Sequence, residues 1–167
     1  MTTSYMHLGE DIDVDAYVIC DYRVTTGMSM EKAANAIAAE QSTGTWTDLT
    51  TTTSKIVENY GAKVLSIDGD MTRIAFPVED FSIDIGGVPQ ILSVIAGNLF
   101  GLESVSKLRL EDVFFPRSIQ EMYKGPKFGV EGMRKLLDRP EKPLVGTIVK
   151  PKIGLSPKYT ANYVYEA

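Results

Sequence analysis

Two lysines near the end of the chain have a spacing that suits chemistry on a small anionic ligand. Lys150 and Lys152 follow an apolar, β-branched run over residues 144–149, which predicts a buried parallel strand. Side chains two residues apart on an extended chain share a face, and Pro151 favours an extended Lys150. Both ammonium groups would then point the same way at the carboxyl end of a strand, where α/β folds bind ligands. On these residues alone, a solvated loop is the commoner interpretation.

Longer motifs favour the functional interpretation. The string Gly146–Gly154, Gly-x-x-x-Lys-Pro-Lys-x-Gly, closely resembles the first barrel strand of the ribulose-1,5-bisphosphate carboxylase/oxygenase (RuBisCO) large chain. Residues 38–46 (AAEQSTGTW) are similar to a second motif of that family, with Gln41 as a departure, and residues 97–101, followed by 108–112, resemble a third. Ile148 stands where plant-type chains carry threonine, so the resemblance is to the form II and archaeal (form III) enzymes.

The resemblance implies roles for single residues. Lys150 would exchange a proton during enolisation of ribulose bisphosphate, which requires a pKa lowered by a neighbouring cation and by burial. Lys152 would bind the substrate. In that family two large chains pair head to tail, and the N-terminal domain of one covers the barrel mouth of the other. This pairing implies four residues that act in the partner's site, although without the resemblance each would be interpreted as structural: Glu40, Thr45, Trp46 and Asn98.

The resemblance also implies a cofactor that this chain does not bind by itself. The family holds Mg²⁺ through a carbamylated lysine, an aspartate and a glutamate on the second barrel strand, which would follow Ala167. The chain is expected to be the N-terminal part of a large chain, to provide no metal ligand and to be inactive alone. The full protein would join CO₂, or O₂ in a side reaction, to the sugar bisphosphate. His7, in the N-terminal arm, is a poor catalytic candidate.

Composition limits the remaining function classes. The 167 residues include 17 Lys and Arg against 22 Asp and Glu, a net charge of −5 without a basic block, which argues against nucleic-acid binding. No run of 18 apolar residues and no signal peptide is visible, so no membrane partner is expected. Cys20, the one cysteine, lies in an apolar run and is interpreted as a core residue. A single thiol favours the cytoplasm.

Hydrophobic periodicity predicts an ordered series of elements. An amphipathic helix begins after Ser29, its predicted N-cap, and ends near Glu40. A second helix begins at Val88-Pro89, buries Leu92, Ile95, Ala96 and Leu99, and ends at Gly101. The pattern predicts strands, joined in one place by a Gly69-Asp70 hairpin turn, over Ala16–Thr25, Lys63–Asp68, Met71–Val78 and Val105–Phe115. Residues 50–53 fit either a strand or a loop.

The order strand, helix, strand, strand, helix, strand is that of the split βαβ, ferredoxin-like α+β fold, an antiparallel sheet with helices on one face. We expect a flexible arm over residues 1–14, this domain over 15–116 and a bridging segment with short helices over 117–143. Residues 144–167 would be the first β/α unit of a TIM barrel, interrupted within its helix.

Two other functions stay open. A RuBisCO-like enolase or isomerase of another phosphorylated sugar would keep the lysine chemistry but usually loses the loop that carries Glu40 and Thr45. A non-catalytic ferredoxin-like module could instead dock onto full-length large chains. The coding sequence beyond Ala167 would distinguish the second alternative.

Overall fold

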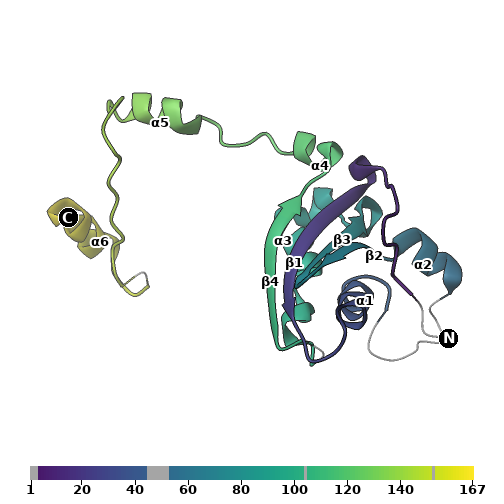
Figure 1. The fold of residues 1–167 in the computed structure, drawn as a ribbon. Coiled ribbons are helices and arrows are strands. Elements are labelled where there is room, and N and C mark those ends of the chain that lie inside the picture. Colours follow the sequence, from purple (N-terminus) through teal and green to yellow (C-terminus); the bar gives the residue numbers. More distant parts are fainter. Residues whose placement is uncertain (1–3, 45–52, 104, 152) are drawn as a thin grey trace. The chain divides into compact units, whose positions relative to one another are not determined.

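The structure of this chain is a computed structural model, which describes residues 4–44, 53–103, 105–151 and 153–167. The chain forms two compact units, Met1–Tyr123 and Lys124–Ala167. Figure 1 shows the sheet and most helices in the first unit and two helices, α5 and α6, in the second. The finer division into arm, domain, bridge and barrel start stays a prediction.

The first unit is built on a four-stranded sheet with the order β2-β3-β1-β4, in which every neighbouring pair is antiparallel. Helix α1 and the short helix α2 connect β1 to β2, and helix α3 connects β3 to β4 (Figure 1). This is the predicted ferredoxin-like arrangement, which is confirmed. The strands are β1 (Tyr17–Thr25), β2 (Lys63–Asp68), β3 (Met71–Pro77) and β4 (Lys107–Phe114).

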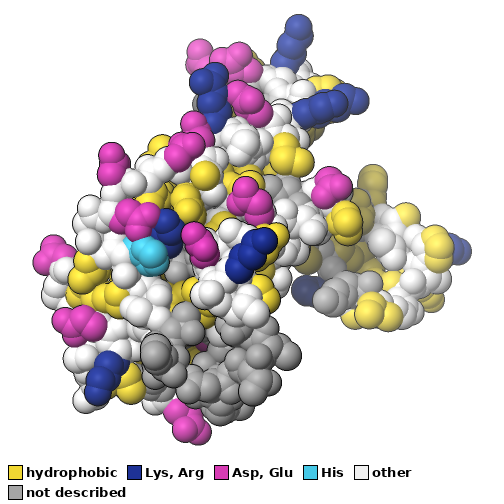
Figure 2. Space-filling model, turned by 90° about the vertical axis from the view of Figure 1, so that its right-hand side faces the viewer, with side chains coloured by type: hydrophobic (Ala, Val, Ile, Leu, Met, Phe, Trp, Pro, Cys, Tyr) yellow, Lys and Arg dark blue, Asp and Glu magenta, His cyan; other side chains and the backbone are white. Residues whose placement is uncertain are grey.

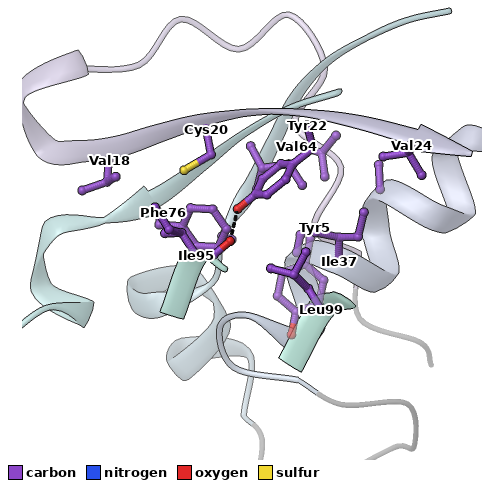
Figure 3. Close-up of a cluster of buried hydrophobic side chains, with 14 of the residues drawn as sticks. Tyr5, Val18, Cys20, Tyr22, Val24, Ile37, Val64, Phe76, Ile95 and Leu99 are labelled. Carbon is purple, nitrogen blue, oxygen red and sulfur yellow. Dashed lines mark hydrogen bonds between the residues drawn. The ribbon is translucent and has the colours of Figure 1, made fainter. Parts of the chain in front are cut away.

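Successive side chains of β1 point to opposite faces of the sheet, and the main core lies on one of these faces. Val18, Cys20, Tyr22 and Val24 are buried and point toward the helices, as Figure 3 shows. The Tyr22 hydroxyl donates a hydrogen bond of 2.6 Å to the Ile95 carbonyl, which satisfies both buried groups. Burial raises the pKa of the Cys20 thiol to about 12, so the thiol stays protonated. The interpretation of Cys20 as a core residue is confirmed.

The opposite face of the sheet carries cross-strand ion pairs beside the buried side chains of Ile19 and Ala75. Arg73 on β3 pairs with Asp21 on β1, with 2.7 Å between Nε and Oδ1. Arg23 on β1 lies 2.8 Å from Glu111 on β4. These cross-strand ion pairs are partly solvated, and such pairs add little stability. Helices α1 and α3 pack on the face that carries Val18, Cys20 and Tyr22, as the sequence predicts.

Helix α1 (Met30–Glu40) follows the periodicity closely. The Ser29 side chain accepts a hydrogen bond from the Lys32 N–H and caps the helix as predicted. Ala33, Ala34, Ile37 and Ala38 are buried against the sheet. Small alanine side chains allow a close approach, so the end of the helix at Glu40 is held firmly by packing.

Helix α3 (Ile83–Ile95) departs from the prediction at both ends. Its backbone is non-helical at Gly87, with φ 56°, and the regular turns follow this kink. Its last residue is Ile95, so the prediction that Gly101 ends the helix is wrong. The chain turns at Gly97, where a Cβ atom would lie 2.1 Å from the Ser93 carbonyl oxygen. Only glycine fits that approach.

A separate 3₁₀ turn, η3 (Asn98–Gly101), follows. Ile91, Ile95 and Leu99 are buried, whereas Leu92 is exposed, contrary to the predicted stripe. The buried stripe of the regular turns runs through Ile91 and Ile95, four residues apart, and Leu99 belongs to the separate turn rather than to this stripe. Further short elements are α2 (Ser54–Tyr60), α4 (Arg117–Met122), η1 (Val14–Ala16) and η2 (Val78–Asp80).

The second unit contains helices α5 (Gly129–Leu136) and α6 (Pro157–Glu166). Residues 144–149, predicted as a strand, form no strand in the structure and are exposed except for the half-buried Val149. A strand is held by hydrogen bonds to a neighbouring strand, and the described residues of this unit contain none. Of the predicted β/α unit, only the helix is therefore formed.

Candidate active site

The carboxyl end of α1 places Glu40 at the edge of the core. Glu40 is the last residue of the helix and is half-buried. Its Oε2 atom is buried and accepts no hydrogen bond from the part of the chain that the structure describes. A buried acceptor without a donor costs about 1–3 kcal/mol, and more when it is charged. Such an oxygen calls for a donor that the described residues do not supply.

The residues after Glu40 are fixed to three parts of the first unit. The Ser42 hydroxyl donates to the Ala38 carbonyl at 2.6 Å and accepts from the Ala62 N–H at 3.0 Å, just before β2. The Thr43 hydroxyl lies 3.0 Å from the Tyr5 hydroxyl in the N-terminal arm. These contacts hold the backbone that leaves the helix in one position.

Gly44 closes this turn. Its N–H donates to the Ala39 carbonyl at 2.9 Å, a bond typical of helix ends. A Cβ atom at Gly44 would lie 2.8 Å from the Tyr5 hydroxyl and 3.0 Å from the Ala39 Cβ. The glycine of the sequence motif is thus required by close packing.

Asn98 begins the η3 turn and is exposed. The preceding Gly97 backbone turns sharply, and the following Leu99 is fully buried in the main core cluster. Helix α1 and η3 lie against each other, so the structure brings Asn98 to the same side of the domain as the end of α1. An exposed amide on an anchored turn can both donate and accept hydrogen bonds.

Sequence reasoning missed one residue, Gln41. It was noted only as a departure from the family motif, yet its side chain is 7% exposed and spans from α1 to α3 and η3. The position of Gln41 in the sequence could have indicated this role. A long amide side chain directly after an alanine-rich helix is suited to reach neighbouring backbone groups.

The predicted lysine chemistry belongs to the second unit. Lys150 is exposed and lies in the second unit, with no strand before it. Lys152, Thr45 and Trp46 lie outside the described residues. The roles predicted for these four residues therefore stay predictions.

No group of three or more His, Cys, Asp or Glu side chains that could hold a metal comes together in residues 4–44, 53–103, 105–151 and 153–167. These residues do not fit a Mg²⁺ site. His7 is half-buried, with Nδ1 2.5 Å from Glu10, and Glu10 also pairs with Lys63. These pairs lower the pKa of the Glu10 carboxyl. Figure 2 shows acidic side chains scattered over the visible face, close to a histidine side chain. In the described part of the chain no helix is long and apolar enough to span a bilayer.

The fold and the site define the first unit as a ferredoxin-like α+β domain with a half-buried carboxylate at the end of α1 and an exposed amide at the start of η3. The model of the family "Ribulose bisphosphate carboxylase large chain, N-terminal domain" matches residues 5–119. The chain therefore belongs to the RuBisCO large-chain family.

Relatives agree with this assignment. The chain is 44% identical to the ribulose bisphosphate carboxylase of Methanocaldococcus jannaschii, with 86% of this chain and 36% of the relative covered. It is also 38% identical to a 3-oxo-isoapionate-4-phosphate transcarboxylase/hydrolase of Xanthobacter autotrophicus, with 89% and 40% covered. The octameric RuBisCO of Pyrococcus horikoshii superposes with a TM-score of 0.77 at 35% identity, with 97% and 38% covered. The chain thus spans well under half the length of these proteins.

Proposed function

We propose that this chain is the N-terminal part of a ribulose-bisphosphate carboxylase of the form II or archaeal type. The whole polypeptide would carboxylate ribulose bisphosphate with CO₂ to give two molecules of 3-phosphoglycerate, with O₂ as a competing substrate in a monooxygenase side reaction. The observation that carries the proposal is Glu40, whose buried Oε2 lacks a donor in the described chain, at the end of a helix whose exit is fixed by hydrogen bonds. Family membership supports it.

In this proposal the first unit acts on the barrel of a second large chain. Glu40 pairs with a lysine of the partner's barrel, since an ammonium group satisfies a buried carboxylate best. Asn98 directs its amide at substrate oxygens, and Thr45 and Trp46 complete the substrate-binding loop. A homodimer or larger oligomer is then required for activity, and the relative from Pyrococcus horikoshii is octameric.

The barrel residues of this chain would serve its own active site. Lys150 exchanges a proton with the substrate carbon during enolisation, and Lys152 binds the anionic substrate. The described residues do not form a Mg²⁺ site, so the magnesium of this proposal, with its carbamylated lysine, belongs to residues outside them. The free thiol of Cys20 fits a cytoplasmic location.

The test is carboxylation of ribulose bisphosphate by the full polypeptide that the coding sequence specifies, with Mg²⁺ and CO₂ present. We expect Glu40→Gln to lower kcat by roughly 100-fold or more, because it removes a charge that stabilises the reacting groups. Glu31→Gln, an exposed carboxylate in the first turn of the same helix, is the matched control and should keep wild-type activity. A full-length protein without carboxylase activity, or a fully active Glu40→Gln variant, would refute the proposal.

The identity to the Xanthobacter transcarboxylase/hydrolase supports a second candidate, a RuBisCO-like enzyme for another phosphorylated sugar. Assays of one preparation on ribulose bisphosphate and on the phosphorylated sugar acid of that relative separate the two functions. A higher kcat/KM on the sugar acid would favour the second candidate.

A further inference from the structure

We propose that Gln41 is a positioning residue that fixes Asn98 relative to Glu40. The Gln41 side-chain amide lies between the Val94 carbonyl and the Leu99 N–H. Only one orientation satisfies both groups: Nε2 donates to the Val94 oxygen, and Oε1 accepts from the Leu99 N–H at 3.0 Å. At 7% exposure the amide is shielded from water. This inference rests on the proposed function for its catalytic consequence.

The two groups that Gln41 binds are the backbone groups that the break between α3 and η3 leaves without a helical partner. Helix α3 ends at Ile95, so the Val94 carbonyl has no N–H four residues further within the helix. Leu99 lies in the first turn of η3, where the backbone N–H groups have no carbonyl of the same helix to bind. A single amide therefore caps the end of one helix and the start of the next.

The two hydrogen bonds of the Gln41 amide, to Val94 and Leu99, are called the Gln41 bridge below. This bridge joins residues next to the two proposed site residues. Gln41 directly follows Glu40, and Leu99 directly follows Asn98. The Gln41 N–H also donates to the Ile37 carbonyl at 3.1 Å, so the residue is anchored on α1. Ile37 and Leu99 belong to the same buried cluster, in which both are labelled in Figure 3. Packing thus sets the separation of α1 and η3, and the amide sets the rotation of the turn that carries Asn98.

A turn held only by Leu99 could rotate about its backbone, because Gly97, just before the turn, has no Cβ atom to restrict its φ and ψ angles. Displacement of a substrate-positioning group by about 1 Å can cost on the order of 100-fold in rate. The Gln41 bridge removes this freedom before substrate binds. Its effect on catalysis is indirect, through the placement of Asn98 and Glu40.

The test compares two substitutions that each remove buried hydrogen bonds with little change in volume. Gln41→Met keeps the length of the side chain but cannot bind Val94 or Leu99. Thr72→Val is the matched control: Thr72 is 2% exposed and donates to the Ser66 carbonyl at 3.1 Å within the β2–β3 hairpin, away from the proposed site. Urea unfolding measures the loss of stability in both variants.

Two readouts distinguish positioning from a general loss of stability. In the 167-residue chain, hydrogen exchange of the Leu99 N–H should accelerate in Gln41→Met and not in Thr72→Val. In the full-length protein, Gln41→Met should lower kcat/KM for ribulose bisphosphate roughly 10- to 100-fold, mainly through kcat, while Thr72→Val keeps the wild-type value.

Unchanged exchange at Leu99, or equal kcat/KM in the two variants at similar stability, would overturn the inference. A wild-type protein that does not carboxylate ribulose bisphosphate would overturn the proposed function alone. In that case the exchange of Leu99 still decides whether the bridge holds the turn.

Discussion

The two units of this chain differ in how their apolar residues are used. In Met1–Tyr123, strands and helices enclose a cluster of buried side chains that includes Tyr22, Ile37 and Phe76. In the described residues of Lys124–Ala167, no side chain is buried. The second unit still forms α5 and α6, because helical hydrogen bonds are local to the segment. Its described residues form no strand, because the hydrogen bonds of a strand require a second segment.

The exposed residues of the second unit indicate what is needed to complete it. Val145 is 95% exposed, Ile148 79% and Ile153 81%, although all three surround the Lys150 motif. Exposed apolar side chains in such number are unusual for a finished domain. In the proposed carboxylase, further barrel strands and helices would cover them and would place Lys150 at the barrel mouth. The predicted lysine site therefore depends on long-range pairing, whereas the backbone that follows Glu40 is already held by local hydrogen bonds.

The largest expected effect tests this difference directly. Phe76 is fully buried at the centre of the first unit, so Phe76→Ala should lower the free energy of unfolding by about 3–5 kcal/mol. Val145→Ala removes an exposed side chain and should change it by less than about 0.5 kcal/mol. Urea unfolding of the 167-residue chain, followed by circular dichroism, measures both. Similar losses in the two variants would mean that the second unit has a core of its own.

The difference between local and long-range interactions also explains which parts of the fold can be predicted from the sequence. Helix α1 was predicted to within its observed bounds, because its cap and its periodicity are both encoded within the helix itself. The β2–β3 hairpin was predicted because Gly69-Asp70 supplies a tight turn between adjacent strands. The end of α3 was not predicted, since the break at Gly97 depends on its approach to Ser93, which periodicity does not encode.

The candidate site follows from sequence only in part. Glu40 and Asn98 were proposed from motifs, and the structure brings their two elements together. Gln41 was missed because its role depends on backbone groups of Val94 and Leu99, more than fifty positions away. The shared face of Lys150 and Lys152 assumed a strand, and that strand needs neighbours which the pattern of residues 144–149 cannot supply.

A second test compares carboxyl groups in the two units. Asp80 is half-buried, and one of its oxygens has no donor in the described chain. Burial, with a smaller contribution from the charge of Glu79, raises the pKa of Asp80 from 3.8 to about 7. Between these values the folded state binds more protons than the unfolded state, so stability should fall as pH rises from about 4 to 7.

Asp80→Asn should remove this fall, which we expect to be roughly 1–2 kcal/mol after allowance for solvent screening. Asp138→Asn, at an exposed position of the second unit, should keep the wild-type pH dependence. Unfolding midpoints in urea at several pH values measure the effect. An Asp80→Asn variant whose stability still falls by the wild-type amount would show that Asp80 is not the group responsible.

The smallest expected effect compares two helix caps of the same kind. Ser29 caps α1 in the first unit and Ser156 caps α6 in the second, each with its hydroxyl oxygen 3.4 Å from the N–H three residues later. Ser29→Ala should lower the free energy of global unfolding by about 1 kcal/mol, because α1 is part of the cooperative core. Ser156→Ala should reduce the helix content of α6 and leave the unfolding midpoint of the first unit unchanged. Hydrogen exchange at Tyr159 and urea unfolding separate the two effects, and an equal shift of the midpoint by both variants would show that α6 unfolds together with the sheet domain.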